Sequence, residues 1–335
     1  MVTDFFSQFK GGNGSQTASS HLARYIAILN GGQVPIPWPH INAEEVFALA
    51  EQMRGVERAL AIDDGGAALV IGKVTTAGQL YDRLCAGIVD IYGRAPGDAQ
   101  VDDNALADAL EIALEWNAPG SGLWLFTTNY DTVIEDSVSR WIDRKRGYFA
   151  LGKLVTGFGE RQPHRFKEGL FRQEPPEGEW LVRLLKLHGS ANWKRETADP
   201  RSAAIETGMR GPTNHDCVLY FGYKTFPESQ PFLALHRLFR QALLQPITLV
   251  SVGFQFGDPY IRELVDFALD ANPSLRVICC LKDEPSDGSS VRELMKRHAM
   301  RFELLRNPAG ALVPFGDQGF RAALNTAVQS AVRAI

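Results

Sequence analysis

The first third of the chain carries the hydrophobic spacing of α-helices. Apolar residues recur there every three or four positions, which places them on one face of a helix. The stretch at 30–42 is rich in Gly and Pro and predicts a loop. The run at 58–74 fits either a hairpin or a connection between two helices. The segments with helical spacing read HLARYIAIL, AEEVFALAEQM, AGQLYDRLCAGIVDIY and ALADALEIALEW.

After Gly122 the pattern changes to short apolar runs separated by polar and glycine-containing stretches. A strand without polar alternation is buried on both faces, as in a parallel sheet covered by helices. Helical spacing returns between several of the runs, and this order predicts the α/β class. We predict a Rossmann-like parallel sheet covered by helices, with a largely helical N-terminal half. The strands are expected at 123–127, 183–187, 217–222, 247–252 and 276–281.

Two helices between these strands have a continuous apolar face. The segment from about 143 to 180 is rich in Arg, Lys, Gly, Pro and Glu, and predicts a long excursion between two core strands. We expect a single domain over 1–335, with a mainly helical part at 1–120, a parallel-sheet core at 121–310 and a C-terminal helix in 311–335. The two apolar faces comprise Ile134, Val138, Trp141 and Ile142 in the first helix, and Ile261, Leu264, Val265, Ala268 and Leu269 in the second.

Composition and charge narrow the class of protein. A chain with 45% hydrophobic and 22% charged residues is typical of a packed globular domain. The net charge of −4 gives no bulk reason to bind polyanions, and the basic residues at 140–153 are typical of a solvated helix face, so no direct nucleic-acid binding is expected. The N-terminus lacks the pattern of a signal peptide, and no window reaches the roughly 18 uninterrupted apolar residues of a membrane span. We expect a soluble, cytoplasmic protein.

The four cysteines include an adjacent pair inside an apolar run, and none is spaced as CxxC. This pattern predicts reduced, buried thiols, and it argues against a disulfide framework and against a cysteine zinc site.

Candidate chemistry is concentrated in three loops that follow predicted strands. In an open parallel sheet, ligands bind beyond the carboxyl ends of the strands, so residues just after each strand are the ones to inspect. The three loops read TTNYD at 127–131, HGSANW at 188–193 and GFQFGDP at 253–259.

Each loop admits a structural and a functional interpretation. Asn129 and Asp131 fit ordinary turn and cap residues, although Thr132-x-x-Glu135 forms a capping box that leaves Asp131 unneeded as a cap. His188 differs from the other six histidines because it follows a strand and precedes Gly-Ser, where an imidazole can transfer protons near a bound ligand.

In the third loop, Gly253 lets the backbone approach a ligand. Asp258 and Pro259 are a standard helix start, and the N-terminus of that helix suits phosphate or ribose.

Taken together, LFTTNYD, KLHGSANW and VSVGFQFGDPYI resemble the sirtuin-like domains of bacterial antiphage defence systems, which hydrolyse NAD. The resemblance covers about 120–285. It implies that Asn129 and His188 form the catalytic pair and that Asp131 lies at the nicotinamide end. The implied reaction cleaves the nicotinamide–ribose bond of the substrate NAD, giving nicotinamide and ADP-ribose. The residues it implies for NAD binding are Thr128, Gly189, Ser190, Gly253, Phe254 and Asp258.

The sequence departs from the family in two places. Protein-deacetylating sirtuins carry a four-cysteine zinc module, and the absence of CxxC here argues against zinc and against lysine deacylation. The family also begins with a strand and a Gly-Ala-Gly-x-Ser loop that holds the NAD pyrophosphate. The nearest match is at 11–15, where Gly-Gly-Asn-Gly-Ser follows no predicted strand and is typical of a surface loop.

Family members are usually silent until they assemble with a partner. The resemblance therefore implies a homo-oligomer and a partner protein such as a HerA-type ATPase or an Argonaute-type sensor, within an antiviral defence complex. A non-catalytic nucleotide-binding or scaffold subunit is the alternative, because loss of the glycine loop is compatible with loss of turnover.

Overall fold

The computed structural model describes part of the chain, and the predictions for the N-terminal third lie largely outside it. Near residue 70, β1 (Val70–Ile71) pairs antiparallel with β2 (Thr75–Thr76). This antiparallel pairing favours the hairpin over a connection between two helices, although the paired strands flank 72–74 and not the Asp-Gly-Gly sequence. The predicted helices before residue 103, the loop at 30–42 and the glycine-rich 11–15 fall outside the described residues. These are 70–71, 75–76, 103–116, 122–145, 151–159, 164–175, 179–196, 204–206, 217–219 and 230–333.

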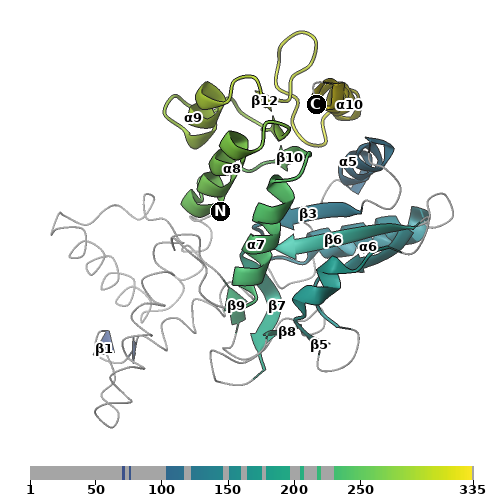
Figure 1. Ribbon diagram of the computed structural model, residues 1–335, viewed down its shortest axis with the longest axis vertical. Helices are drawn as coiled ribbons and strands as arrows, with labels where there is room; N and C mark the ends of the chain where they lie inside the picture. Colours follow the sequence, from purple (N-terminus) through teal and green to yellow (C-terminus); the bar gives the residue numbers. More distant parts are fainter. Residues whose placement is uncertain are drawn as a thin grey trace, which may run out of the picture.

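The core strands are parallel and covered by helices, as predicted, and they form two three-stranded sheets (Figure 1). Every pairing within these sheets is parallel. All seven residues of the central strand in the first sheet are buried, including Arg183 and Lys186, which fits a strand covered on both faces. The first sheet has the order β3 (Leu123–Thr127), β6 (Trp180–Lys186), β4 (Leu151–Val155), and the second has the order β10 (Thr248–Val252), β11 (Arg276–Cys280), β12 (Phe302–Leu304).

The helices bury the faces that their apolar spacing predicts. In α6, Val138, Trp141 and Ile142 are buried, and Ile134 packs against them. In α8 all five predicted residues are buried. The C-terminal helix lies beside α5, where Arg321 pairs with Asp108 at 2.7 Å. The helices are α5 (Asp103–Trp116), α6 (Val133–Lys145), α7 (Phe232–Leu243), α8 (Pro259–Ala271), α9 (Ser290–Arg297) and α10 (Phe320–Arg333).

A four-stranded antiparallel sheet corrects two of the sequence predictions. The stretch 188–193 was expected to be a loop, yet a turn at Leu187–His188 leads directly into strand β7. The run at 217–222 was expected to join the parallel sheet, but β9 pairs antiparallel with β7, with Gly189 opposite Leu219. An unbroken apolar run indicates burial and carries no information on strand direction. The sheet has the order β5 (His164–Arg165), β8 (Ala204–Glu206), β7 (Gly189–Arg195), β9 (Cys217–Leu219).

The segment 143–180 is more than an excursion between core strands. It contains β4, which pairs with β6 inside the first parallel sheet, and the 3-10 helix η3 (Glu168–Arg172). The strand reads LGKLV, and its Gly and Lys hide the apolar pattern that marks the other core strands.

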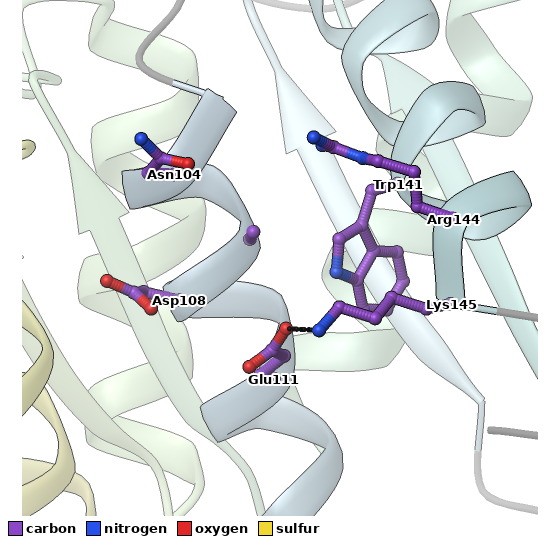
Figure 2. A pocket seen from close by; sticks show the side chains of 7 residues that line it. Asn104, Asp108, Glu111, Trp141, Arg144 and Lys145 are labelled. Atoms are coloured by element: carbon purple, nitrogen blue, oxygen red, sulfur yellow. Dashed lines mark ion pairs between the residues drawn. The ribbon is translucent and has the colours of Figure 1, made fainter. Parts of the chain in front are cut away.

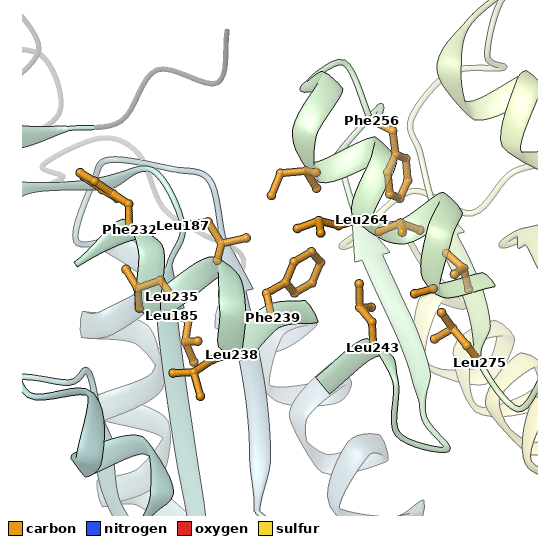
Figure 3. Packing of buried hydrophobic residues seen from close by; sticks show 14 of the residues in the cluster. Leu185, Leu187, Phe232, Leu235, Leu238, Phe239, Leu243, Phe256, Leu264 and Leu275 are labelled. Atoms are coloured by element: carbon orange, nitrogen blue, oxygen red, sulfur yellow. The ribbon is translucent and has the colours of Figure 1, made fainter. Parts of the chain in front are cut away.

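The largest hydrophobic cluster joins the two parallel sheets through α7 and α8 (Figure 3). The rings of Phe126 in β3 and Phe239 in α7 meet edge to face, with centroids 4.7 Å apart. Leu264 and Leu269 of α8 bury their side chains in the same cluster. Within the described residues, no helix combines the length and the hydropathy needed to cross a bilayer.

Candidate functional site

The loops after β3 and β6 are held side by side at the carboxyl ends of their strands. The two strands pair in register up to Thr127 and Lys186. Beyond them, the Leu187 amide donates to the Thr127 carbonyl at 2.8 Å. The Tyr130 carbonyl accepts from the Ala191 amide at 2.8 Å and from Ser190 Oγ at 3.2 Å. The first and second predicted loops therefore form one continuous region.

His188 connects this region to the third loop. Its Nε2 lies 2.8 Å from Asp258 Oδ2, and each of the two side chains is 3% exposed. The other carboxylate oxygen, Oδ1, accepts from the Ile261 amide at 2.9 Å and caps α8. The predicted helix start at Asp258 is confirmed, and the same carboxylate also binds the histidine that sequence analysis singled out.

Asn129 and Asp131 lie at the surface side of the first loop. Asn129 is exposed, and its amide donates to Thr127 Oγ1 at 3.0 Å. Asp131 Oδ1 accepts from the Val133 amide at 3.1 Å, so Asp131 caps the start of α6. The predicted capping box is therefore wrong. Glu135 Oε1 bonds to Lys186 Nζ at 2.7 Å instead, because that buried ammonium needs a carboxylate partner.

The residues expected to bind NAD divide into open and enclosed groups. Gly253 is exposed at φ +67°, with open space where a Cβ would lie, and Thr128 is partly exposed. Phe254 packs edge to face on Phe256, with centroids 5.0 Å apart. Ser190 is fully buried. Gly189 is enclosed as well: at φ +86°, a Cβ there would lie 2.1 Å from the Val218 carbonyl oxygen, so only glycine fits.

Lys186 is a residue of this region that sequence analysis did not single out. Its side chain is 2% exposed, and Nζ donates both to the Asp131 carbonyl and to Glu135. The contact with Asp131 ties the first loop to the strand that precedes His188. A single Lys inside the buried run RLLKL was the available signal, because a buried ammonium is almost always paired.

His236 of α7 is a second buried histidine near the site. It is 1% exposed, and its ring centroid lies 5.2 Å from that of Tyr260. Burial, reinforced by the nearby His188, lowers the pKa of His236 to about 4. The neutral ring is therefore the form that the folded protein stabilises.

We expect the stability of the protein to fall as the pH drops from about 6.5 to 4. The unfolded chain binds a proton on His236 near pH 6.5, whereas the folded chain binds it only near pH 4. The contribution of this residue is complete above pH 6.5, and its loss amounts to roughly 3 kcal/mol. Urea denaturation at pH 7 and pH 4.5 measures the change, and the variant His236→Gln should show a smaller difference. An equal pH dependence in the variant would contradict this assignment.

A pocket of about 360 Å³ lies elsewhere, between α5 and α6 (Figure 2). The Lys145–Glu111 ion pair, 2.8 Å long, crosses its wall. α6 rises about 18 Å from Val133 to Lys145, and the pocket lies against its last turn, at the opposite end from the first loop. The lining contains none of the predicted site residues and consists of Asn104, Ala107, Asp108, Glu111, Trp141, Arg144 and Lys145.

Neither cysteines nor other donors assemble into a metal site in the described ranges. Cys279 and Cys280 are free and buried there, and no group of three or more His, Cys, Asp or Glu side chains is arranged to hold a metal ion. Burial raises the pKa of the Cys279 thiol to about 12, which keeps it protonated.

Comparison with known proteins identifies the family. The profile of the SIR2-like domain matches residues 124–302, which is more than half of the chain. No curated protein matches the chain. The matched range contains all of the predicted site residues, from Thr128 to Asp258, and the SIR2-like domain is that of an NAD-dependent enzyme family. The protein belongs to the SIR2-like domain family.

Proposed function

We propose that this protein is an NAD glycohydrolase that cleaves the nicotinamide–ribose bond, releases nicotinamide and ADP-ribose, and depletes NAD. The observation that carries the proposal is the junction of the loops bearing Asn129 and His188 at the ends of two paired parallel strands. The carboxyl ends of such strands are where α/β proteins bind nucleotides.

The chemistry of the reaction suits these side chains. The water oxygen bonds to C1′ of the ribose as the glycosidic bond breaks, and the bonding electrons neutralise the positively charged pyridinium ring. The site must therefore stabilise an oxocarbenium-like ribose and orient a nucleophile. The exposed Asn129 amide both donates and accepts, so it can hold the water or the ribose hydroxyls. His188 takes the proton, and Asp131 accepts from the carboxamide.

We propose that NAD depletion serves an antiviral defence complex in the cytoplasm. The protein would assemble as a homo-oligomer with a partner such as a HerA-type ATPase or an Argonaute-type sensor, which would hold it silent until infection. The support is the resemblance of the three loops to sirtuin-like defence effectors.

A non-catalytic nucleotide-binding or scaffold subunit is the second candidate. The burial of His188, which is 3% exposed and bonded to Asp258, favours it, since a general base must reach the substrate.

Incubation of the purified protein with NAD, alone and together with a co-expressed partner, discriminates between the candidates. Chromatography measures nicotinamide release, and calorimetry measures NAD binding. Release of nicotinamide supports the glycohydrolase. Binding of NAD without release under both conditions supports the non-catalytic nucleotide-binding subunit, and the absence of both would overturn the glycohydrolase and the nucleotide-binding subunit together.

A further inference from the structure

The geometry points to Asp258 as the positioning residue of His188, which orients the imidazole and decides which ring nitrogen carries the proton. Sequence analysis assigned Asp258 to NAD binding instead. The expected effect of Asp258 on turnover rests on the proposed NAD hydrolysis, whereas its effect on the tautomer of His188 does not.

Both oxygens of the Asp258 carboxylate are engaged within the protein. Oδ2 lies 2.8 Å from His188 Nε2, and Oδ1 accepts from the Ile261 amide at 2.9 Å. The side chain is 3% exposed. A carboxylate held in this way is directed at the histidine and at the helix cap, and a ribose hydroxyl would have to displace one of these partners.

The contact determines the tautomer of His188. An ionised carboxylate only accepts hydrogen bonds, so Nε2 must carry the hydrogen in the pair. In the neutral ring the lone pair then resides on Nδ1, which becomes the proton-accepting atom. A carboxylate that orients an imidazole in this way recurs in hydrolases and metal sites, where it fixes both the tautomer and the ring plane.

The contact between His188 and Asp258 also joins two segments that are distant in sequence. His188 follows β6, and Asp258 begins α8, which packs in the cluster that joins the two parallel sheets. The position of the imidazole is thereby set by the first turn of α8.

The variant Asp258→Asn tests the inference. The asparagine oxygen can still accept from the Ile261 amide, and Asn is as good a helix cap as Asp, so the fold should persist. We expect kcat for NAD hydrolysis to fall by about 100-fold or more while KM stays unchanged, because the amide nitrogen then faces Nε2 and donates to it, which favours the ring with its proton on Nδ1. Nitrogen-15 NMR of the His188 ring should show Nε2 protonated in the wild type and Nδ1 protonated in the variant.

The pair His298–Asp266 supplies a matched control within the same chain. His298 Nε2 lies 2.7 Å from Asp266 Oδ1, and His298 is 3% exposed. It joins α8 to the end of α9 and contains none of the predicted site residues. The variant Asp266→Asn should keep the kcat of the wild type.

Three results would overturn the inference. The first is a rise in the KM of Asp258→Asn with kcat unchanged, which would make Asp258 a ligand contact. The second is a variant whose kcat and KM both equal those of the wild type. The third is a wild-type His188 with its proton on Nδ1. The nitrogen-15 spectrum is recorded without NAD. A wild type that releases no nicotinamide but shows Nε2 protonation would therefore overturn the proposed hydrolase while supporting the role of Asp258.

Discussion

The variant Asn129→Ala is expected to release nicotinamide from NAD about 10²- to 10⁴-fold more slowly than the wild type. This is the usual loss of rate when an enzyme loses a group that positions the nucleophile or transfers its proton. Asn129 is exposed, and its backbone amide, which the substitution leaves in place, donates to Thr127 Oγ1. The substitution should therefore leave the free energy of unfolding nearly unchanged, so that a loss of turnover reports on chemistry. Steady-state nicotinamide release and thermal denaturation measure the two effects.

The matched control is Asn325→Ala, which removes an exposed asparagine from α10 that accepts a hydrogen bond from Trp116. Its turnover should equal that of the wild type. His188→Ala should abolish turnover as well, but it leaves the buried Asp258 carboxylate without its partner and costs about 1–3 kcal/mol of stability. Undiminished turnover in Asn129→Ala would remove this residue from the proposed mechanism.

Much of the fold could be predicted because the central strands of the two parallel sheets, β6 and β11, are almost entirely buried and the strands beside them are largely apolar. The runs at 123–127 and 276–281 match β3 and β11 closely, and the apolar face of α8 is confirmed at every predicted residue. β4 escaped prediction, because its Gly and Lys interrupt the apolar run. The direction of β9 escaped it as well, since strand pairing depends on contacts that are distant in sequence.

The site could be predicted only at the level of its loops. The rule that ligands bind beyond parallel strand ends correctly brought the loops after β3 and β6 together. The same rule could not predict which side chains bond to one another within the site. His188 and Asp258 are 70 residues apart, and Asp258 alone is indistinguishable from an ordinary helix cap. Whether Asn129 and His188 act on NAD stays a prediction.

The variant Lys186→Met should lower the free energy of unfolding by about 3–5 kcal/mol, the usual cost of removing one partner from a buried ion pair. The Lys186 side chain is 2% exposed, and Glu135 is 13% exposed. Burial already raises the pKa of Glu135, although Lys186 opposes that shift. Without the ammonium, the carboxylate would lose its compensating charge, and the Asp131 carbonyl would lose a donor. Urea denaturation at pH 7 measures the loss.

Two further variants show whether the loss of stability comes from the burial of the Lys186–Glu135 ion pair or from the loss of any ion pair. Lys145→Met breaks the more exposed pair with Glu111, 2.8 Å long, and should cost less than about 1 kcal/mol. The double variant Lys186→Met with Glu135→Leu removes both charges and should regain most of the lost stability. It does not restore the hydrogen bond to the Asp131 carbonyl, so the loop that carries Asn129 should remain less well held and nicotinamide release should stay reduced. Wild-type turnover in the stable double variant would show that Lys186 acts on stability and not on the position of this loop.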